Sequence, residues 1–259
     1  MPADADELVH YALAGGVATI TLDSPHNRNA LSAQLRRELL AHFERSAQDD
    51  AVRVVVLTHT GRVFCSGMDL SEARGGDASA QGVNEFPHIL QTIWQHPKPV
   101  ITRVAGPARA GGIGLIAACD IAVAGASATF GFSEVRIGVV PAVISVTVLP
   151  RITPRAAQEL FLTGEVFDAS RAAAIGLLTA SVPDAELDGA VAAYVTSLAK
   201  GGPEAIAATK AMLSARDGDL QAQFADKTAL SASFFASAEA QEGITAFAQK
   251  RPARWVPTD

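Results

Sequence analysis

Hydrophobic and polar residues follow strand and helix periods in turn along residues 1–200. Val17–Leu22 alternates with the two-residue period of a strand, and turn-forming residues follow it. Leucines then recur at helical spacing after Ser32, a good N-cap residue, which predicts a helix that ends near Ala47. Arg53–Thr58 and Val100–Val104 have little alternation, which is typical of strands buried on both faces.

Helical periods dominate the rest of the sequence. Helices are predicted at Gly82–His96, Leu115–Cys119, Pro154–Thr163, Ser170–Ile175, Asp184–Ala199, Pro203–Ala215 and Leu220–Ala238. Short strands are predicted at Ile121–Ala124, Ala128–Phe130 and Leu177–Val182. This order predicts an α/β body over residues 1–200 and a helical region over residues 201–259.

The composition is that of a globular protein, with 49% hydrophobic and 19% charged residues in a chain of 259. Lys and Arg number 21 and Asp and Glu number 27, so the net charge of −6 argues against a nucleic-acid partner. The N-terminal segment is acidic and lacks the apolar core of a signal peptide, and uncharged stretches are too short to span a bilayer. We therefore expect a cytoplasmic protein with no membrane partner.

Residue counts also exclude several catalytic chemistries. Cys65 and Cys119 form no CxxC pair, and the six histidines form no HExxH pair, so we expect no metal site. Nucleophile-elbow and phosphate-loop motifs are absent as well. Neither cysteine has an identifiable basic partner, so both are predicted to be packing residues.

Three segments beside predicted strands are candidates for chemistry. Arg62–Leu70 follows a buried strand, where α/β proteins often bind ligands. Gly106–Gly114 combines small residues with the free amides of a helix start, although its glycines do not spell a dinucleotide-binding motif. Phe130–Gly138 places Glu134 among apolar residues, which raises a carboxyl pKa and suits proton transfer. Taken singly, each also has a plain structural reading: a loop connection, tight helix packing, or a salt bridge between Glu134 and Arg136.

Taken together, two loop amides facing a carboxylate would stabilise an enolate beside a proton-transfer group. The order of the motifs resembles the crotonase family, also called the enoyl-CoA hydratase/isomerase superfamily. The resemblance runs from Val17 to Trp255 and is carried by Asn27–Leu31, Phe64–Leu70, Ala110–Gly112, Cys119–Ile121, Phe130–Glu134, Glu242–Phe247 and Lys250–Arg251.

This resemblance implies a spiral of ββα units whose helical C-terminal region mediates trimerisation, often into a dimer of trimers. It implies an acyl-CoA thioester as substrate and no separate cofactor, since coenzyme A enters as part of the substrate. The oxyanion amides would belong to Met68 and Gly111, and Glu134 would transfer the proton. The implied substrate- and CoA-binding residues are Arg28, Ala30, Ser66, Gly67, Met68, Asp69, Leu70 and Gly111, with Phe247 and Lys250 reaching the CoA of a neighbouring subunit. We also expect Arg251 and Arg62 to attract the anionic CoA.

The sequence departs from typical hydratases at one functional position. The first of the family's two glutamates is replaced by Gly114, and Pro141–Ser145 replaces a glycine-rich segment. The segment that begins at Ser133 resembles bacterial hydratases of branched acids, such as methylglutaconyl-CoA hydratase, which share this glycine. With Gly114 lacking a side chain, the attacking water would be held by a backbone carbonyl in the glycine loop or by a carboxylate from another segment, for which Asp69 and Glu72 are candidates.

The resemblance therefore predicts a hydro-lyase that adds water to a 2-enoyl-CoA. A double-bond isomerase with one glutamate base is the first alternative, because moving a proton along the acyl chain needs no second carboxylate. A catalytically weak acyl-CoA-binding protein is the second alternative.

Overall fold

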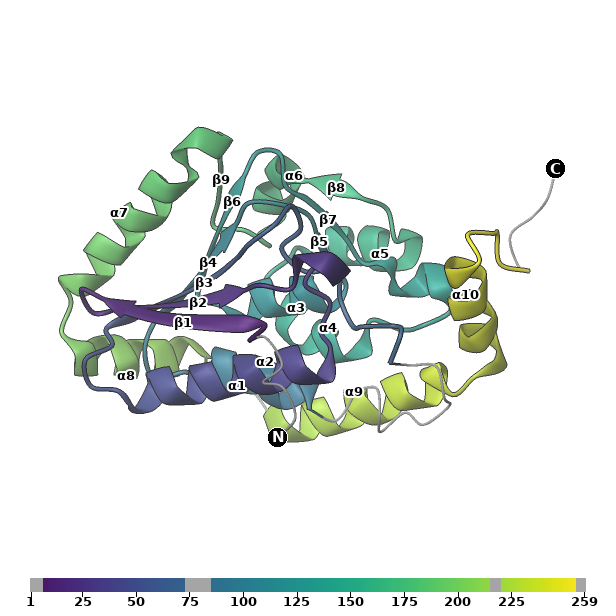
Figure 1. The fold of residues 1–259 in the computed structure, drawn as a ribbon, viewed down its shortest axis with the longest axis horizontal. Helices are drawn as coiled ribbons and strands as arrows, with labels where there is room; N and C mark the ends of the chain where they lie inside the picture. Colours follow the sequence, from purple (N-terminus) through teal and green to yellow (C-terminus); the bar gives the residue numbers. More distant parts are fainter. Residues whose placement is uncertain (1–6, 73–84, 215–219, 255–259) are drawn as a thin grey trace.

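A six-stranded sheet runs through the centre of the molecule in the order β1-β2-β3-β4-β6-β9 (Figure 1). The computed structural model describes residues 7–72, 85–214 and 220–254. The strands of the sheet are β1 Val9–Ala14, β2 Val17–Leu22, β3 Val54–His59, β4 Val100–Val104, β6 Ile121–Gly125 and β9 Ala180–Val182. β1 and β2 are antiparallel, whereas the other neighbours are parallel. A second, three-stranded sheet contains β5 Ala108–Arg109, β7 Thr129–Gly131 and β8 Phe167–Asp168.

Helices cover both faces of the large sheet. The α-helices are α1 Ala33–Gln48, α2 Phe86–Trp94, α3 Gly111–Ala118, α4 Ala142–Val148, α5 Pro154–Thr163, α6 Ala169–Ala174, α7 Leu187–Ala199, α8 Pro203–Ser214, α9 Leu220–Phe235 and α10 Ala238–Ala248. Three 3₁₀ segments are η1 Pro25–Asn27, η3 Ser133–Ile137 and η4 Asp184–Glu186. This mixed α/β architecture with a helical C-terminal region agrees with the fold predicted from the sequence.

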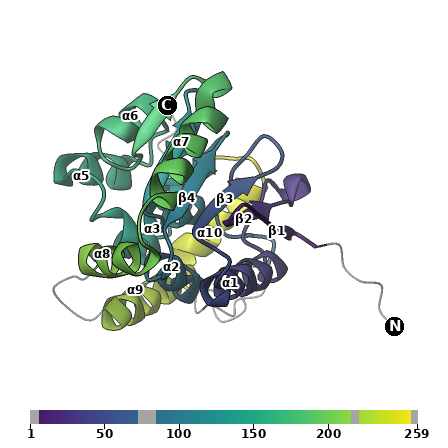
Figure 2. The same cartoon turned by 90° about the vertical axis from the view of Figure 1, so that its left-hand side faces the viewer.

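The central strands are buried on both faces, as their continuous apolar sequence predicts. In β3, Val55 and Leu57 belong to the main core, while Val54 and Val56 pack with Leu187 and Val191 of α7. Figure 2 shows α7 along one side of the sheet, away from α1 and α2. The strand ends that lead into the candidate segments are therefore held by packing from two layers.

Capping residues in the sequence predict where several of the helices begin and end. The Ser32 hydroxyl accepts a hydrogen bond from the Leu35 amide at 3.4 Å at the start of α1. Several predicted boundaries differ from the structure. α3 begins at Gly111 rather than at Leu115, β9 begins at Ala180 rather than at Leu177, and the helix predicted to run to Ala238 ends at Phe235. The helix predicted from Asp184 is divided into η4 and α7, and the predicted helix ends at Gly82 and Ala215 lie outside the described residues. The Ser237 side chain caps α10 by accepting from the Ala240 amide at 3.1 Å, so a new helix begins there.

Several elements were not predicted from the sequence, among them β1, α4 and the two-residue strands β5 and β8. β1 is an edge strand with mostly exposed residues, so its hydrophobic alternation is weak. The signal for it is the Gly15-Gly16 pair, whose φ angles of 57° and 80° form the two-residue hairpin turn to β2. α4 is buried and almost wholly apolar, so it has no amphipathic period to detect.

The C-terminal helices pack onto the body. α9 packs against α4, and its Phe224 is part of the main core. α10 packs against η3 and lies at the end of the molecule opposite α7 (Figure 1). The predicted boundary at residue 200 falls just after α7, which ends at Ala199.

Candidate active site

A mainly apolar cavity of about 190 Å³ opens between the body and the C-terminal helices. It is lined by Ser66, Met68 and Leu70 after β3, Phe86 of α2, Ala110 and Gly111 at the start of α3, Ser133, Glu134, Arg136 and Ile137 of η3, residues 139–144, and Ser231, Phe235 and Phe247 of α9 and α10. All three candidate segments thus contribute to one site.

The amides of Met68 and Gly111 come from two loops that touch each other. A Cβ atom on Gly67 would stand 3.5 Å from the Gly111 nitrogen, and Gly67 has a φ of 91° that a side chain rarely adopts. The carbonyl of Gly67 accepts from the Leu31 amide at 2.8 Å, which anchors the first loop. Within the described ranges, the Met68 and Gly111 amides donate to no acceptor. Two free donors therefore lie side by side at the cavity wall.

Ala110 fixes the second loop in an unusual backbone conformation. Its φ of 47° and ψ of −119° lie in a region that favours glycine. The Ala110 amide donates to the Gly131 carbonyl at 3.2 Å, and a Cβ atom on Gly67 would stand 3.0 Å from the Ala110 side chain. This conformation turns the chain so that α3 starts with its amides toward the cavity.

Glu134 is the carboxyl group of the cavity. Its Oε2 atom is buried and has no hydrogen-bond partner in the described part of the chain. Burial raises the pKa of Glu134 to about 7. A carboxyl group with this pKa exchanges protons readily near neutral pH. Arg136 pairs instead with Glu165, so the alternative of a Glu134–Arg136 salt bridge is wrong.

The position of the missing family glutamate is filled by another side chain. A Cβ atom on Gly114 would stand 2.6 Å from Cγ2 of Ile144 and 3.2 Å from its Cβ. Ile144 belongs to α4 and is buried at the cavity wall. The structure therefore has an apolar wall where typical hydratases place a second carboxylate.

Asp69 and Glu72 do not supply a replacement. Asp69 accepts from the Ser71 amide at 2.9 Å and from Asn27 Nδ2 at 3.3 Å. Glu72 accepts from the Ala33 amide at 2.9 Å at the start of α1. Neither residue is part of the cavity lining, so the expectation that one of them holds water there is wrong.

The Asn27–Leu31 segment is shaped by Asn29. This buried side chain accepts from the Ser24 amide at 2.6 Å and donates to the Thr60 and Val63 carbonyls at 3.1 and 2.8 Å. Arg28 and Asn29 both have positive φ, of 62° and 52°. The Arg28 carbonyl accepts from the Ser66 amide at 3.1 Å, so this turn is tied to the candidate oxyanion loop.

The predicted CoA-binding residues are only partly brought together. Ser66, Met68, Leu70, Gly111 and Phe247 line the cavity, whereas Arg28, Ala30, Gly67, Asp69 and Lys250 do not. Arg28 and Lys250 are exposed and form no ion pair with another described residue. Both side chains are therefore available to an anionic ligand. Arg62 is exposed as well.

The C-terminal motif holds two residues that were expected to face CoA. Phe247 lines the cavity of its own chain, and its expected contact with the CoA of a neighbouring subunit stays a prediction. Arg251 pairs with both carboxylate oxygens of Glu242, at 2.7 and 3.0 Å, and the Arg254 amide donates to the same carboxylate at 3.0 Å. These contacts lower the pKa of Glu242 to about 2, with the Arg251 hydrogen bonds as the main cause. Arg251 therefore fastens the chain end to α10 instead of facing the cavity.

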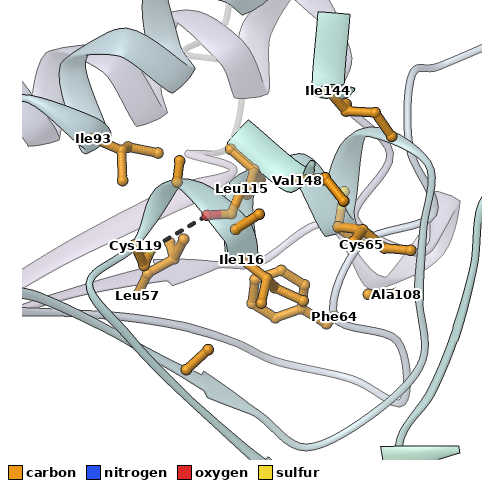
Figure 3. Packing of buried hydrophobic residues seen from close by; sticks show 14 of the residues in the cluster. Leu57, Phe64, Cys65, Ile93, Ala108, Leu115, Ile116, Cys119, Ile144 and Val148 are labelled. Carbon is orange, nitrogen blue, oxygen red and sulfur yellow. Dashed lines mark hydrogen bonds between the residues drawn. The ribbon is translucent and has the colours of Figure 1, made fainter. Parts of the chain in front are cut away.

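Both cysteines are buried packing residues, as predicted. Burial raises the pKa of each thiol to about 12, so neither is a thiolate at neutral pH. Figure 3 shows them among core side chains, with the Cys119 thiol donating to the Leu115 carbonyl at 3.2 Å. In the described ranges, no cluster of His, Cys, Asp and Glu is suited to a metal ion, and no helix is long and apolar enough to cross a membrane.

Sequence reasoning missed the residues that shape the cavity from α2, α4 and α9, among them Phe86, Ile144 and Phe235. These are apolar residues on unrelated segments, and only the tertiary structure brings them together. The one sequence signal was Gly114 itself, because a missing side chain implies that a neighbour fills the space.

The chain is similar to known proteins over almost its whole length. The family profile described as enoyl-CoA hydratase/isomerase matches residues 13–257. A probable enoyl-CoA hydratase of Rhodobacter capsulatus is 37% identical over 94% of this chain and 96% of its own length. The 2,3-dehydroadipyl-CoA hydratase of Escherichia coli is 33% identical over 91% of this chain and 93% of its own length. A crystal structure of a putative enoyl-CoA hydratase from Mycobacterium avium paratuberculosis superposes with a TM-score of 0.88 at 43% identity, covering 96% of this chain and all of that one.

Proposed function

Because the chain belongs to the enoyl-CoA hydratase/isomerase family, we propose that it adds water across the double bond of a 2-enoyl-CoA thioester. The observation that supports this most is the buried, unpartnered carboxyl oxygen of Glu134 in the same cavity as two free amides. Donors of this kind stabilise the charge that develops on a thioester oxygen, and each is worth about 10²–10³ in rate.

The proposed reaction uses one carboxyl group in both of its protonation states. The thioester oxygen accepts hydrogen bonds from the amides of Met68 and Gly111. Ionised Glu134 takes a proton from water as the water oxygen bonds to C3 and the double-bond electrons move to the thioester oxygen. The protonated Glu134 then gives that proton to C2 as the enolate collapses. One water is added and Glu134 is regenerated, for which a pKa of about 7 is well suited.

A double-bond isomerase is the second candidate, and the contact between Gly114 and Ile144 favours it. No carboxylate stands at that wall to hold water, and isomerisation needs only a base that removes and returns a proton. The similarity to proteins described as hydratases over almost the whole chain supports the first candidate.

An assay in water enriched in heavy oxygen distinguishes the hydratase from the isomerase. We expect wild-type protein to convert 2-enoyl-CoA to a 3-hydroxyacyl-CoA that carries the heavy oxygen, and the Glu134→Gln variant to lose this activity. Migration of the double bond of a 3-enoyl-CoA, with no heavy oxygen incorporated from either substrate, would establish the isomerase instead. If the protein binds acyl-CoA but turns over neither substrate, it is an acyl-CoA-binding member of the family and neither enzyme activity is correct.

Assembly and location belong to the same proposal: a homotrimer or a dimer of trimers that acts in the cytoplasm. The assembly is supported by the exposed apolar surface of the C-terminal region, where Leu213 of α8 is 74% exposed and Leu230 of α9 is 39% exposed.

A further inference from the structure

The backbone of α10 touches the backbone of η3, the segment that carries Glu134. A Cβ atom on Gly243 would stand 2.3 Å from the carbonyl oxygen of Ile137 and 2.5 Å from its carbonyl carbon. On the other side, a Cβ atom on Gly138 would stand 3.0 Å from the carbonyl oxygen of Glu239. Two glycines thus allow the two segments to meet without an intervening side chain.

This contact leaves little freedom to adjust. The atoms that a side chain at 243 would meet belong to the main chain of Ile137, which cannot turn aside as a flexible side chain can. Gly138 ends η3 with a φ of 72°, and the Val139 amide donates to the Glu134 carbonyl at 3.0 Å. A displacement of Ile137 is therefore passed directly to the turn that contains Glu134.

Apolar packing holds α10 against η3. Ala240 and Ile244 of α10 form a buried cluster with Val139 and with Phe235 of α9. Positions 240, 243, 244 and 247 share one face of the helix, and Phe247 on that face lines the cavity. The same face thus contacts η3 and closes the cavity that contains Glu134.

We propose that Gly243 is a positioning residue for catalysis: by seating α10 on η3, it fixes the Glu134 carboxyl group and keeps water away from it. This inference rests on the proposed role of Glu134 in proton transfer. A displacement of about 1 Å at a reacting group costs on the order of 10²-fold in rate. Opening the cavity to water also removes the desolvation that raises the pKa of Glu134, so its titration midpoint falls toward the ordinary value of 4.5.

Gly243→Ala tests the proposal, and Gly189→Ala is the matched control. Gly189 lies inside α7, and a Cβ atom there would meet nothing within 4 Å, so both variants gain the same helix propensity but only one meets a neighbour. The readouts are kcat, KM and the titration of the Glu134 carboxyl carbon by NMR of protein labelled with carbon-13 glutamate. The Glu134→Gln variant assigns the signal.

We expect Gly243→Ala to lower kcat by about 10- to 100-fold, with a smaller change in KM and a lower titration midpoint for Glu134. Gly189→Ala should match wild type in all three. An unchanged midpoint in Gly243→Ala would overturn the proposal, whatever the kcat of that variant. If that variant does not fold, Ile244→Val is the test, because it removes one methyl group from the buried cluster that packs α10 against η3. A lower titration midpoint of Glu134 in Ile244→Val supports the proposal, and an unchanged midpoint overturns it.

The titration also separates this proposal from the proposed function. A midpoint that falls in Gly243→Ala, in a protein without turnover of enoyl-CoA, would overturn the function but support the positioning role. Turnover in wild type with an unchanged midpoint in Gly243→Ala would overturn the positioning role alone.

Discussion

Ile144 occupies the space into which any side chain at position 114 would extend, with its Cγ2 atom 2.6 Å from the place of the absent Cβ. Gly114 and Ile144 come from different helices, α3 and α4, so each determines the size allowed to the other. This pair places a methyl group of Ile144 beside the backbone of Gly114 at the cavity wall.

The pair should behave as one unit in stability measurements. Gly114→Glu alone should lower the free energy of unfolding by about 1–3 kcal/mol, because it overpacks the site. Added to Ile144→Ala, the same change should cost less than it does alone, since the smaller residue makes room. Denaturant unfolding of the two single variants and the double variant measures this coupling. Strictly additive effects would contradict the contact.

Glu134 should make stability depend on pH. Its pKa is raised in the folded protein from 4.5 to about 7, so the unfolded chain loses this proton first as pH rises. Stability from this group is thus present below about pH 4.5 and is lost between there and pH 7, by on the order of 3 kcal/mol. Glu134→Gln should remove that dependence and lower kcat by about 10²–10⁴. The free energy of unfolding at pH 4.5 and pH 8 checks the first effect, and an equal slope in both proteins would contradict it.

Ala110→Gly should stabilise the fold and impair catalysis. Glycine adopts the φ of 47° without strain. The relief of strain exceeds the cost of the extra conformational entropy that glycine gives the unfolded chain, so the net gain in stability is about 1 kcal/mol. The Gly111 amide becomes less fixed, so kcat should fall several-fold. Thermal unfolding checks the stability of the Ala110→Gly variant, and steady-state kinetics on the same preparation checks its kcat. A melting temperature below that of the wild type would show that the alanine conformation is unstrained.

Lys250 should contribute to CoA binding, whereas Arg251 should not do so directly. Lys250→Ala should weaken acetyl-CoA binding about tenfold, the usual size for loss of one charged hydrogen bond. Arg251→Ala is the comparison, because its guanidinium group is already bound to Glu242. Calorimetric titration measures both. Unchanged affinity in Lys250→Ala would remove that residue from the site.

Light scattering at micromolar concentration should give three or six times the chain mass of 26.9 kDa. Leu230→Asp in α9 should shift the protein toward monomer, because it places a charge in the proposed interface. Leu13→Asp on the edge strand β1 is the control, because Leu13 is 40% exposed and Leu230 is 39% exposed, and it should leave the mass unchanged. A wild-type mass of one chain would contradict the assembly.

Features set by neighbouring residues were predictable from the sequence, and features set by contacts between distant segments were not. Ser32 marks the start of α1, and α5 spans Pro154–Thr163 as predicted, with Gly164 at its C-terminal cap. These ends were predictable because capping and backbone preferences act over a few residues. Glu134, Met68 and Gly111 were predicted as site residues from motif order, and all three line one cavity. The wall formed by Ile144 and the seat of α10 at Gly243 depend on packing between helices, for which a single sequence has no local signal.

The placement of Phe247 determines how mixed assemblies should behave. Since Phe247 lines the cavity of its own chain, we predict that Glu134 and Phe247 act within one polypeptide. Co-assembling chains that lack Glu134 with chains altered at Phe247 should then restore no activity, because no single chain in a mixed assembly carries both residues intact. Each chain of an assembly would contain its own complete site, and the activity of a mixed assembly would scale with its fraction of intact chains.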